Sequence, residues 1–112
     1  MSELNYPQAI ADLGETITGE TGVMSQAVRQ AIVAQTVAAI KHGEPQRDGM
    51  VPANLQAYLQ KVATHSYKVT DQDINRLKYA GYSEDEIFEA TVGVAFGAAL
   101  ARVETAFALF EN

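Results

Sequence analysis

The sequence contains no cysteine, which excludes disulfide bonds, thiolate metal sites, iron–sulfur clusters and cysteine nucleophiles together. It also lacks any pair of adjacent Lys or Arg residues, and 14 acidic residues outnumber 8 basic ones to give a net charge of −6. A protein that follows a phosphate backbone or an anionic bilayer needs a basic patch. We therefore expect neither nucleic acid nor membrane as a partner.

Targeting and membrane segments are also missing from the pattern. The N-terminal residues show neither the basic nor the apolar region of a secretory signal. The longest uncharged stretch in the C-terminal half, residues 90–101, is shorter than the about 20 residues that cross a bilayer. We therefore expect a cytoplasmic protein, and its 112 residues, 47% of them hydrophobic, suit a single folded domain.

Helical periodicity dominates the chain from residue 24 onward, and no segment alternates apolar and polar residues as a β-strand does. Residues 1–22, with their run of glycine and threonine, predict a flexible arm that holds a helical turn or two. Residues 23–112 predict one domain, with helices over 24–42, from Pro52 onward, over 71–79 and over 84–110. The predicted fold class is all-α: a small bundle of about four main helices with a long C-terminal one.

Local signals mark the ends of these helices. Gly43 suits the left-handed position after the first helix, and Pro52 suits the first position of the second. Thr70 is placed to cap the short third helix. Ser83 and Glu86 form a capping box that opens the long fourth helix.

The long helix is apolar on nearly every side between residues 90 and 101. Gly93, Gly97 and Ala101 lie four apart on one face, which lets another helix approach closely. The first helix is similarly uncharged over residues 30–40. A four-helix monomer of this size cannot cover two such helices on every side, so we predict a homo-oligomer.

Two patterns that imitate known binding loops fail on chemistry. Residues 14–21 have the glycine spacing of a phosphate-binding loop, but Glu20 stands where lysine is required. Residues 71–75 imitate the start of a calcium loop, but Arg76 stands at the glycine position and helix capping explains the two aspartates. We predict no cofactor and no metal.

The remaining isolated charges have structural explanations. His42 and His65 have no histidine one turn away, and each suits the C-terminal end of a helix dipole; a functional role is the alternative for His65. Glu89, Arg102 and Glu104 flank the apolar stretch of the last helix. They predict an ion pair or solvated rim, with a charge turned into an interface or a pocket as the alternative.

One segment stands out: Leu77-Lys78-Tyr79-Ala80-Gly81-Tyr82-Ser83-Glu84-Asp85-Glu86-Ile87-Phe88-Glu89-Ala90. With the Ala- and Val-rich helix after it, it resembles the alkylhydroperoxidase-like family, also called the carboxymuconolactone decarboxylase-like superfamily. The likeness extends over about residues 55–110, and residues before it are compatible with it. The resemblance implies a helical fold and a site on the helix just before the turn at Ala80 and Gly81.

Peroxidase members of that family carry a Cys-x-x-Cys-x-x-x-His motif on this helix. Counting back from Gly81, the two cysteine positions fall on Ser66 and Val69 and the histidine position on Asp73. Peroxide reduction through a disulfide needs one thiolate to attack and a second thiol to resolve it. A serine hydroxyl and an isopropyl group do neither, so we expect no thiol-dependent peroxidase activity.

Decarboxylase members work by acid–base chemistry without metal or redox cofactor, and this route needs no cysteine. The resemblance then implies His65, Tyr67 and Asp73 as catalytic candidates, with Tyr79 and Glu89 as further pocket residues. Each of them also has a structural explanation as a cap, a dipole partner, a core aromatic or a surface charge.

Three functions stay open at this point, and with them the question whether the protein is an enzyme. The first is an alkylhydroperoxidase-like protein without redox cysteines, with no assigned activity and no necessary catalysis. The second is a cofactor-independent acid–base enzyme, of decarboxylase or isomerase type, that acts on a small organic acid through residues 66–73. The third is a helical module that binds a protein or an apolar ligand along the long helix.

Overall fold

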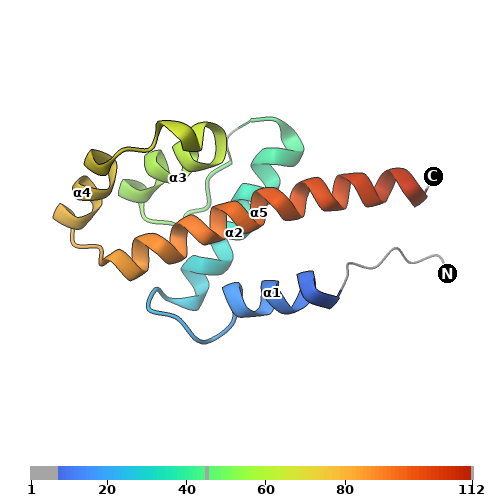
Figure 1. Ribbon diagram of the computed structural model, residues 1–112, viewed down its shortest axis with the longest axis horizontal. Helices are drawn as coiled ribbons and strands as arrows, with labels where there is room; N and C mark the ends of the chain where they lie inside the picture. The colour runs from blue at the N-terminus through green and yellow to red at the C-terminus, as the bar shows by residue number, and fades with distance from the viewer. Residues whose placement is uncertain (1–7, 45, 112) are drawn as a thin grey trace.

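Helices account for all regular secondary structure in residues 8–44 and 46–111, the part of the chain that the computed structural model describes (Figure 1). The elements in order are α1 (Gln8–Thr18), α2 (Gln26–His42), α3 (Ala53–His65), the single 3-10 turn η1 (Ser66–Lys68), α4 (Asp71–Tyr79) and α5 (Glu84–Glu111). The predicted all-α class and the long C-terminal helix are confirmed for these residues.

The capping signals work as the sequence predicts. Gly43 follows α2 in the left-handed conformation, with φ of 74°, and its amide donates to a carbonyl in the last turn. The Thr70 hydroxyl accepts from the Asp73 amide, and the Asp73 carboxylate accepts from the Thr70 amide in return. Ser83 and Glu86 make the same reciprocal pair at the start of α5, at 2.9 and 3.1 Å.

The helices α2 and α5 form the central pair of the bundle, and they approach each other across small residues. A Cβ atom on Gly93 would lie 3.2 Å from Cγ2 of Ile32, and one on Gly97 would lie 2.9 Å from Cβ of Thr36. Ala101, on the same face of α5, is fully buried. The helix that the small-residue face of α5 admits is therefore α2 of the same chain.

The hydrophobic core lies where α3 packs against the central pair. Its largest fully buried side chains come from all three helices: Ile32, Leu55, Leu59 and Val94. Beside α3, at the left end of the molecule in Figure 1, α4 and the start of α5 close the end of the bundle, with Leu77 buried in the core. Burial of such aliphatic side chains is the main force that holds these elements together.

The helix α1 has 11 residues and is longer than the turn or two that the sequence analysis places in this part of the chain. Ile10 and Ile17 are half-buried along it, and the helix packs beside α2 and α5 (Figure 1). Gly14 lets the Phe96 ring approach to 3.1 Å from where a Cβ would stand. Tertiary contact with α5 therefore supplies the stability that local propensity lacks. Residues 1–7 of the expected arm lie outside the described residues.

Length and composition alone make α5, over Glu84–Phe110, long and apolar enough to cross a membrane. These 27 residues form a longer stretch than the uncharged run at residues 90–101, from which we expected no membrane-spanning segment. In the structure, one side of α5 is buried in the bundle at Ala90, Val94, Ala98 and Ala101. Of its most apolar segment, 28% is buried inside the bundle; a mostly buried core helix of a soluble protein passes the same length and composition test.

Candidate functional site

An open groove of about 500 Å3 lies between α3 and α4. Its lining side chains come from these two helices and the loop before α3: Arg47, Asn54, Ala57, Tyr58, Gln60, Lys61, Thr64, His65, Asp73, Arg76 and Leu77. Of the residues that the sequence analysis proposed as catalytic, the groove brings together His65 and Asp73. We call this feature the α3–α4 groove.

Positive charge dominates the α3–α4 groove. Lys61 donates to Asp73 at 2.8 Å, so these two charges compensate each other. Arg47 and Arg76 also line the groove, and neither has an ion-pair partner among the described residues. In a chain of net charge −6, two unpaired guanidinium groups at one opening favour an anionic ligand.

Asp73 holds Lys61 and the first turn of α4 in place at this groove. The hydrogen bond from the Lys61 ammonium, followed by the bond from the Thr70 amide, lowers the pKa of Asp73 from 3.8 to about 2. Its carboxylate is therefore ionised at neutral pH and engaged by the cap of α4 and by Lys61. A carboxylate with so low a pKa is a weak general base.

His65 is the remaining titratable group that suits acid–base chemistry in the groove. It is exposed at the end of α3, and its Nδ1 atom lies 3.0 Å from the Thr64 hydroxyl. The other ring nitrogen, Nε2, has no hydrogen-bond partner in residues 8–44 and 46–111. Because Thr64 holds one edge of the ring, the second edge is free to meet a bound molecule.

The other predicted residues lie outside the groove lining. Tyr67 is exposed on η1, where its ring and the His65 ring pack in a T-shaped arrangement with 5.9 Å between centroids. Ser66 is exposed as well, whereas Val69 packs against the core. Tyr79 is 95% exposed at the end of α4. The structure thus does not bring Tyr67 or Tyr79 into the groove with His65.

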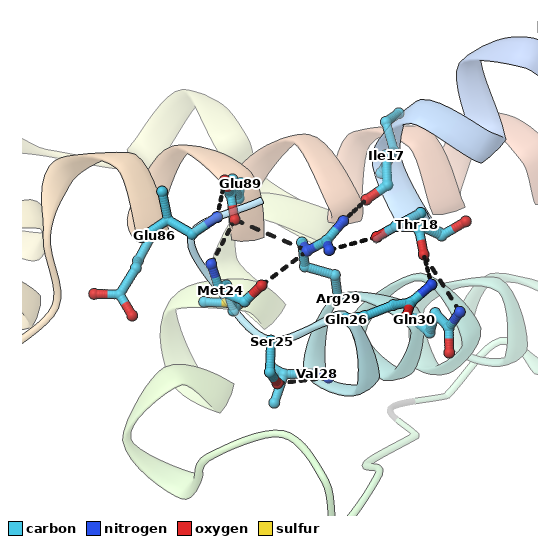
Figure 2. A network of polar contacts seen from close by, with 12 residues as sticks. Ile17, Thr18, Met24, Ser25, Gln26, Val28, Arg29, Gln30, Glu86 and Glu89 are labelled. Atoms are coloured by element: carbon cyan, nitrogen blue, oxygen red, sulfur yellow. Dashed lines mark hydrogen bonds and ion pairs between the residues drawn. The ribbon is translucent and has the colours of Figure 1, made fainter. Parts of the chain in front are cut away.

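Glu89 lies in a different network, where the linker between α1 and α2 meets α5 (Figure 2). Its two carboxylate oxygens accept from the main-chain amides of Val23 and Met24, both at 2.8 Å. The Arg29 Nε atom lies 3.9 Å away. Glu89 therefore fastens the linker to α5 and has no part in the groove.

Arg29 is a buried residue that the sequence analysis missed. It is 3% exposed, and its guanidinium donates to the main-chain carbonyls of Ile17, Gly19 and Met24 (Figure 2). Three carbonyl acceptors and the nearby Glu89 offset the cost of burying its charge. The available signal was its place one turn before the fully buried Ile32, on the core face of α2.

Comparison with known proteins gives no match: no family model, curated protein or solved structure resembles this chain closely enough to count. Within the described part of the chain, no group of three or more His, Asp or Glu side chains could hold a metal ion. The alkylhydroperoxidase-like resemblance stays a prediction.

Proposed function

We propose that this chain is a cysteine-free, alkylhydroperoxidase-like helical protein whose α3–α4 groove binds a small organic anion. The choice of an anion as ligand depends on one observation: Arg47 and Arg76 line the groove, and neither has a partner carboxylate in the described chain. A guanidinium can give two parallel N–H bonds to one carboxylate, which makes arginine well suited to such ligands. Electrostatic attraction at the groove acts against the overall negative charge of the protein.

Two features support the family part of the proposal. All described elements are helical, and a capped turn joins α4 to α5 at the place where the resemblance expects one. The motif positions Ser66 and Val69 lie on η1 and in the loop after it, not on an α-helix as the resemblance implies. Since Ser66 and Val69 occupy the cysteine positions, the proposal includes no thiol chemistry. Peroxide should not be consumed with a dithiol reductant above the rate without protein; protein-dependent turnover would contradict this part.

Isothermal titration with succinate at low ionic strength tests the groove. We expect R76Q to weaken succinate binding by about tenfold, equal to about 1.4 kcal/mol, because one charge-assisted contact is lost. The matched control is R102Q, since Arg102 is exposed on α5 outside the groove lining. Absence of succinate binding, or equal binding by R76Q and the unaltered protein, would contradict the proposal.

A second candidate function is acid–base catalysis on the bound acid. The Nε2 atom of His65 favours it, because an imidazole nitrogen without a protein partner can exchange a proton with an acid bound in the groove. H65Q should then bind a substrate acid as well as the unaltered protein does, while turnover falls by about 100-fold or more. Equal turnover by H65Q would leave the groove as a binding site alone.

We propose further that copies of this chain associate through α5. Leu109 and Phe110 are 73% and 76% exposed at its C-terminal end, which extends beyond the other helices in Figure 1. Phe88 is exposed near its start. Large exposed apolar side chains on a folded protein are typical of interaction surfaces. The cytoplasmic location stays a prediction.

A further inference from the structure

A second hollow, of about 250 Å3, lies between α2 and α3. We call it the α2–α3 hollow. Its wall is largely aliphatic, with contributions from Ala39, Ile40, Leu59 and Ala63. Two charged side chains, Glu44 and Arg47, border it, both exposed at its margin. Its volume exceeds that of the about 150 Å3 engineered cavity that holds a benzene molecule.

Two buried glutamines from facing helices border the hollow, and their amides pair with each other. Gln35 on α2 donates through Nε2 to Oε1 of Gln56 on α3 at 2.9 Å, and Gln56 donates back to Oε1 of Gln35 at 3.1 Å. Both side chains are more than nine-tenths buried. The two carboxamides thus form a closed ring of two hydrogen bonds.

The main chain of Asp48 occupies one edge of this ring. Its N–H donates to Oε1 of Gln35 at 2.8 Å, and its carbonyl accepts a long bond of 3.5 Å from Nε2 of Gln56. Because a main-chain N–H can only donate, this contact identifies the oxygen of Gln35. The reciprocal bonds then fix which atom of Gln56 is nitrogen and which is oxygen.

The opposite edge of the ring, formed by Nε2 of Gln35 and Oε1 of Gln56, has no further hydrogen-bond partner among the described residues; we call it the unfilled edge. Gln35 keeps its second Nε2–H, and Gln56 keeps the second lone pair of Oε1; neither has a partner in the described residues. In a ring of this kind these two groups lie side by side. Both glutamines border the hollow, whereas Asp48 at the filled edge does not, which is the arrangement expected when the unfilled edge faces the hollow.

We propose that the α2–α3 hollow binds an uncharged small molecule with a cyclic cis-amide, as in a lactam or imide ring. A cis-amide presents N–H and C=O side by side, which is the complement of the unfilled edge and the pattern that Asp48 already presents to the other edge. The aliphatic wall covers the ring carbons of the ligand, and the two buried carboxamides, which are uncharged, offer no ion-pair partner to an ionised group.

Titration of the full chain with δ-valerolactam, followed by 15N NMR, tests the proposal. The side-chain NH2 signals of Gln35 and Gln56 should shift with saturation. N-methyl-δ-valerolactam, which lacks only the donor, should bind at least about tenfold more weakly because a buried acceptor is then unpaired. Equal binding of the two lactams, or no shift up to the solubility limit, would overturn the proposal.

A variant with a larger side chain in the α2–α3 hollow tests where the lactam binds. A63L places a larger side chain in the hollow and leaves the glutamine pair intact, so lactam binding should fall by about tenfold or more. A57L is the control, because Ala57 lies on α3 and borders only the groove. Circular dichroism verifies that both variants are folded. Lactam binding by A63L as tight as by A57L would overturn the assignment to the hollow.

Discussion

Arg29 donates to the carbonyls of Ile17, Gly19 and Met24 from a buried position. R29M keeps much of the side-chain volume and leaves these acceptors without a donor, and each such loss costs about 1–3 kcal/mol when water cannot replace it. We expect the free energy of unfolding to fall by roughly 2–4 kcal/mol, as measured by urea denaturation. Hydrogen exchange in α1 should accelerate, because the carbonyls of Ile17 in its last turn and of Gly19 just after it are released.

A matched substitution on the surface shows whether the effect is specific. R76M removes an arginine that has no ion-pair partner in the described residues, and we expect a change within about 0.5 kcal/mol. If R29M and R76M had equal effects on unfolding and on exchange in α1, the role given to Arg29 would be wrong.

Asp73 predicts a dependence of stability on pH. Its pKa is lowered from 3.8 to about 2 by Lys61 and Thr70, so the folded state favours the ionised carboxylate. The stabilising contribution is complete above pH 3.8 and is lost as the pH falls toward 2. D73N should therefore be less stable than the unaltered protein at pH 6, with most of the difference lost near pH 2 and the rest at lower pH.

Urea denaturation over this pH range measures the effect. D71N is the control, because Asp71 lies in the same first turn of α4 but outside the contact with Lys61. A difference between D73N and the unaltered protein that stays constant from pH 6 to pH 2 would contradict the linkage.

The sequence could single out His65 and Asp73 because the resemblance placed both near one motif. It could not supply Arg47 and Arg76 as their neighbours, since one lies in a loop and the other on α4, and only the packing of α3 against α4 brings them to one groove. The unfilled edge of the Gln35 and Gln56 pair is likewise a product of tertiary structure alone.

At the scale of the elements, the contact between α2 and α5 depends on Gly97. A Cβ there would lie 3.0 Å from the main-chain oxygen of Val33 as well as close to Thr36, and neither the backbone nor a β-branched residue moves easily. G97A should lower the thermal midpoint, corresponding to a loss of about 1–3 kcal/mol, although alanine has the better helix propensity.

Gly93 provides the comparison on the same helix. Its closest neighbour would be the Cγ2 methyl of Ile32 at 3.2 Å, a side-chain atom that can shift by a few tenths of an ångström. G93A should therefore be nearly neutral, because the gain in helix propensity offsets the crowding. G97A as stable as G93A would contradict the close approach at Gly97.

The elements also show which parts of the fold were predictable. The ends of α4 and α5 depend on caps made within a few residues, at Thr70 and Ser83, so the local sequence specifies them. The helix α1 was underestimated because its order depends on contact with Phe96 and on the carbonyl bonds from Arg29, which are distant in sequence.

At the scale of the whole molecule, the proposed association through α5 predicts a mass above 12.1 kDa in light scattering at micromolar concentration. Combined substitution of Leu109 and Phe110 by serine should return the mass to that of the monomer, because the exposed apolar end of α5 is removed. L13S is the control, since Leu13 is exposed on α1. A monomeric unaltered protein would contradict the association.

The central claim is that the α3–α4 groove holds a small anion through Arg47 and Arg76. A 15N NMR titration with succinate tests it most directly, because it reports the location of binding as well as its strength. The account predicts saturable shifts for the amides of Lys61, Thr64 and Arg76, with the C-terminal turns of α5 unchanged. Shifts confined to other surfaces, or no shifts at low ionic strength, would contradict it.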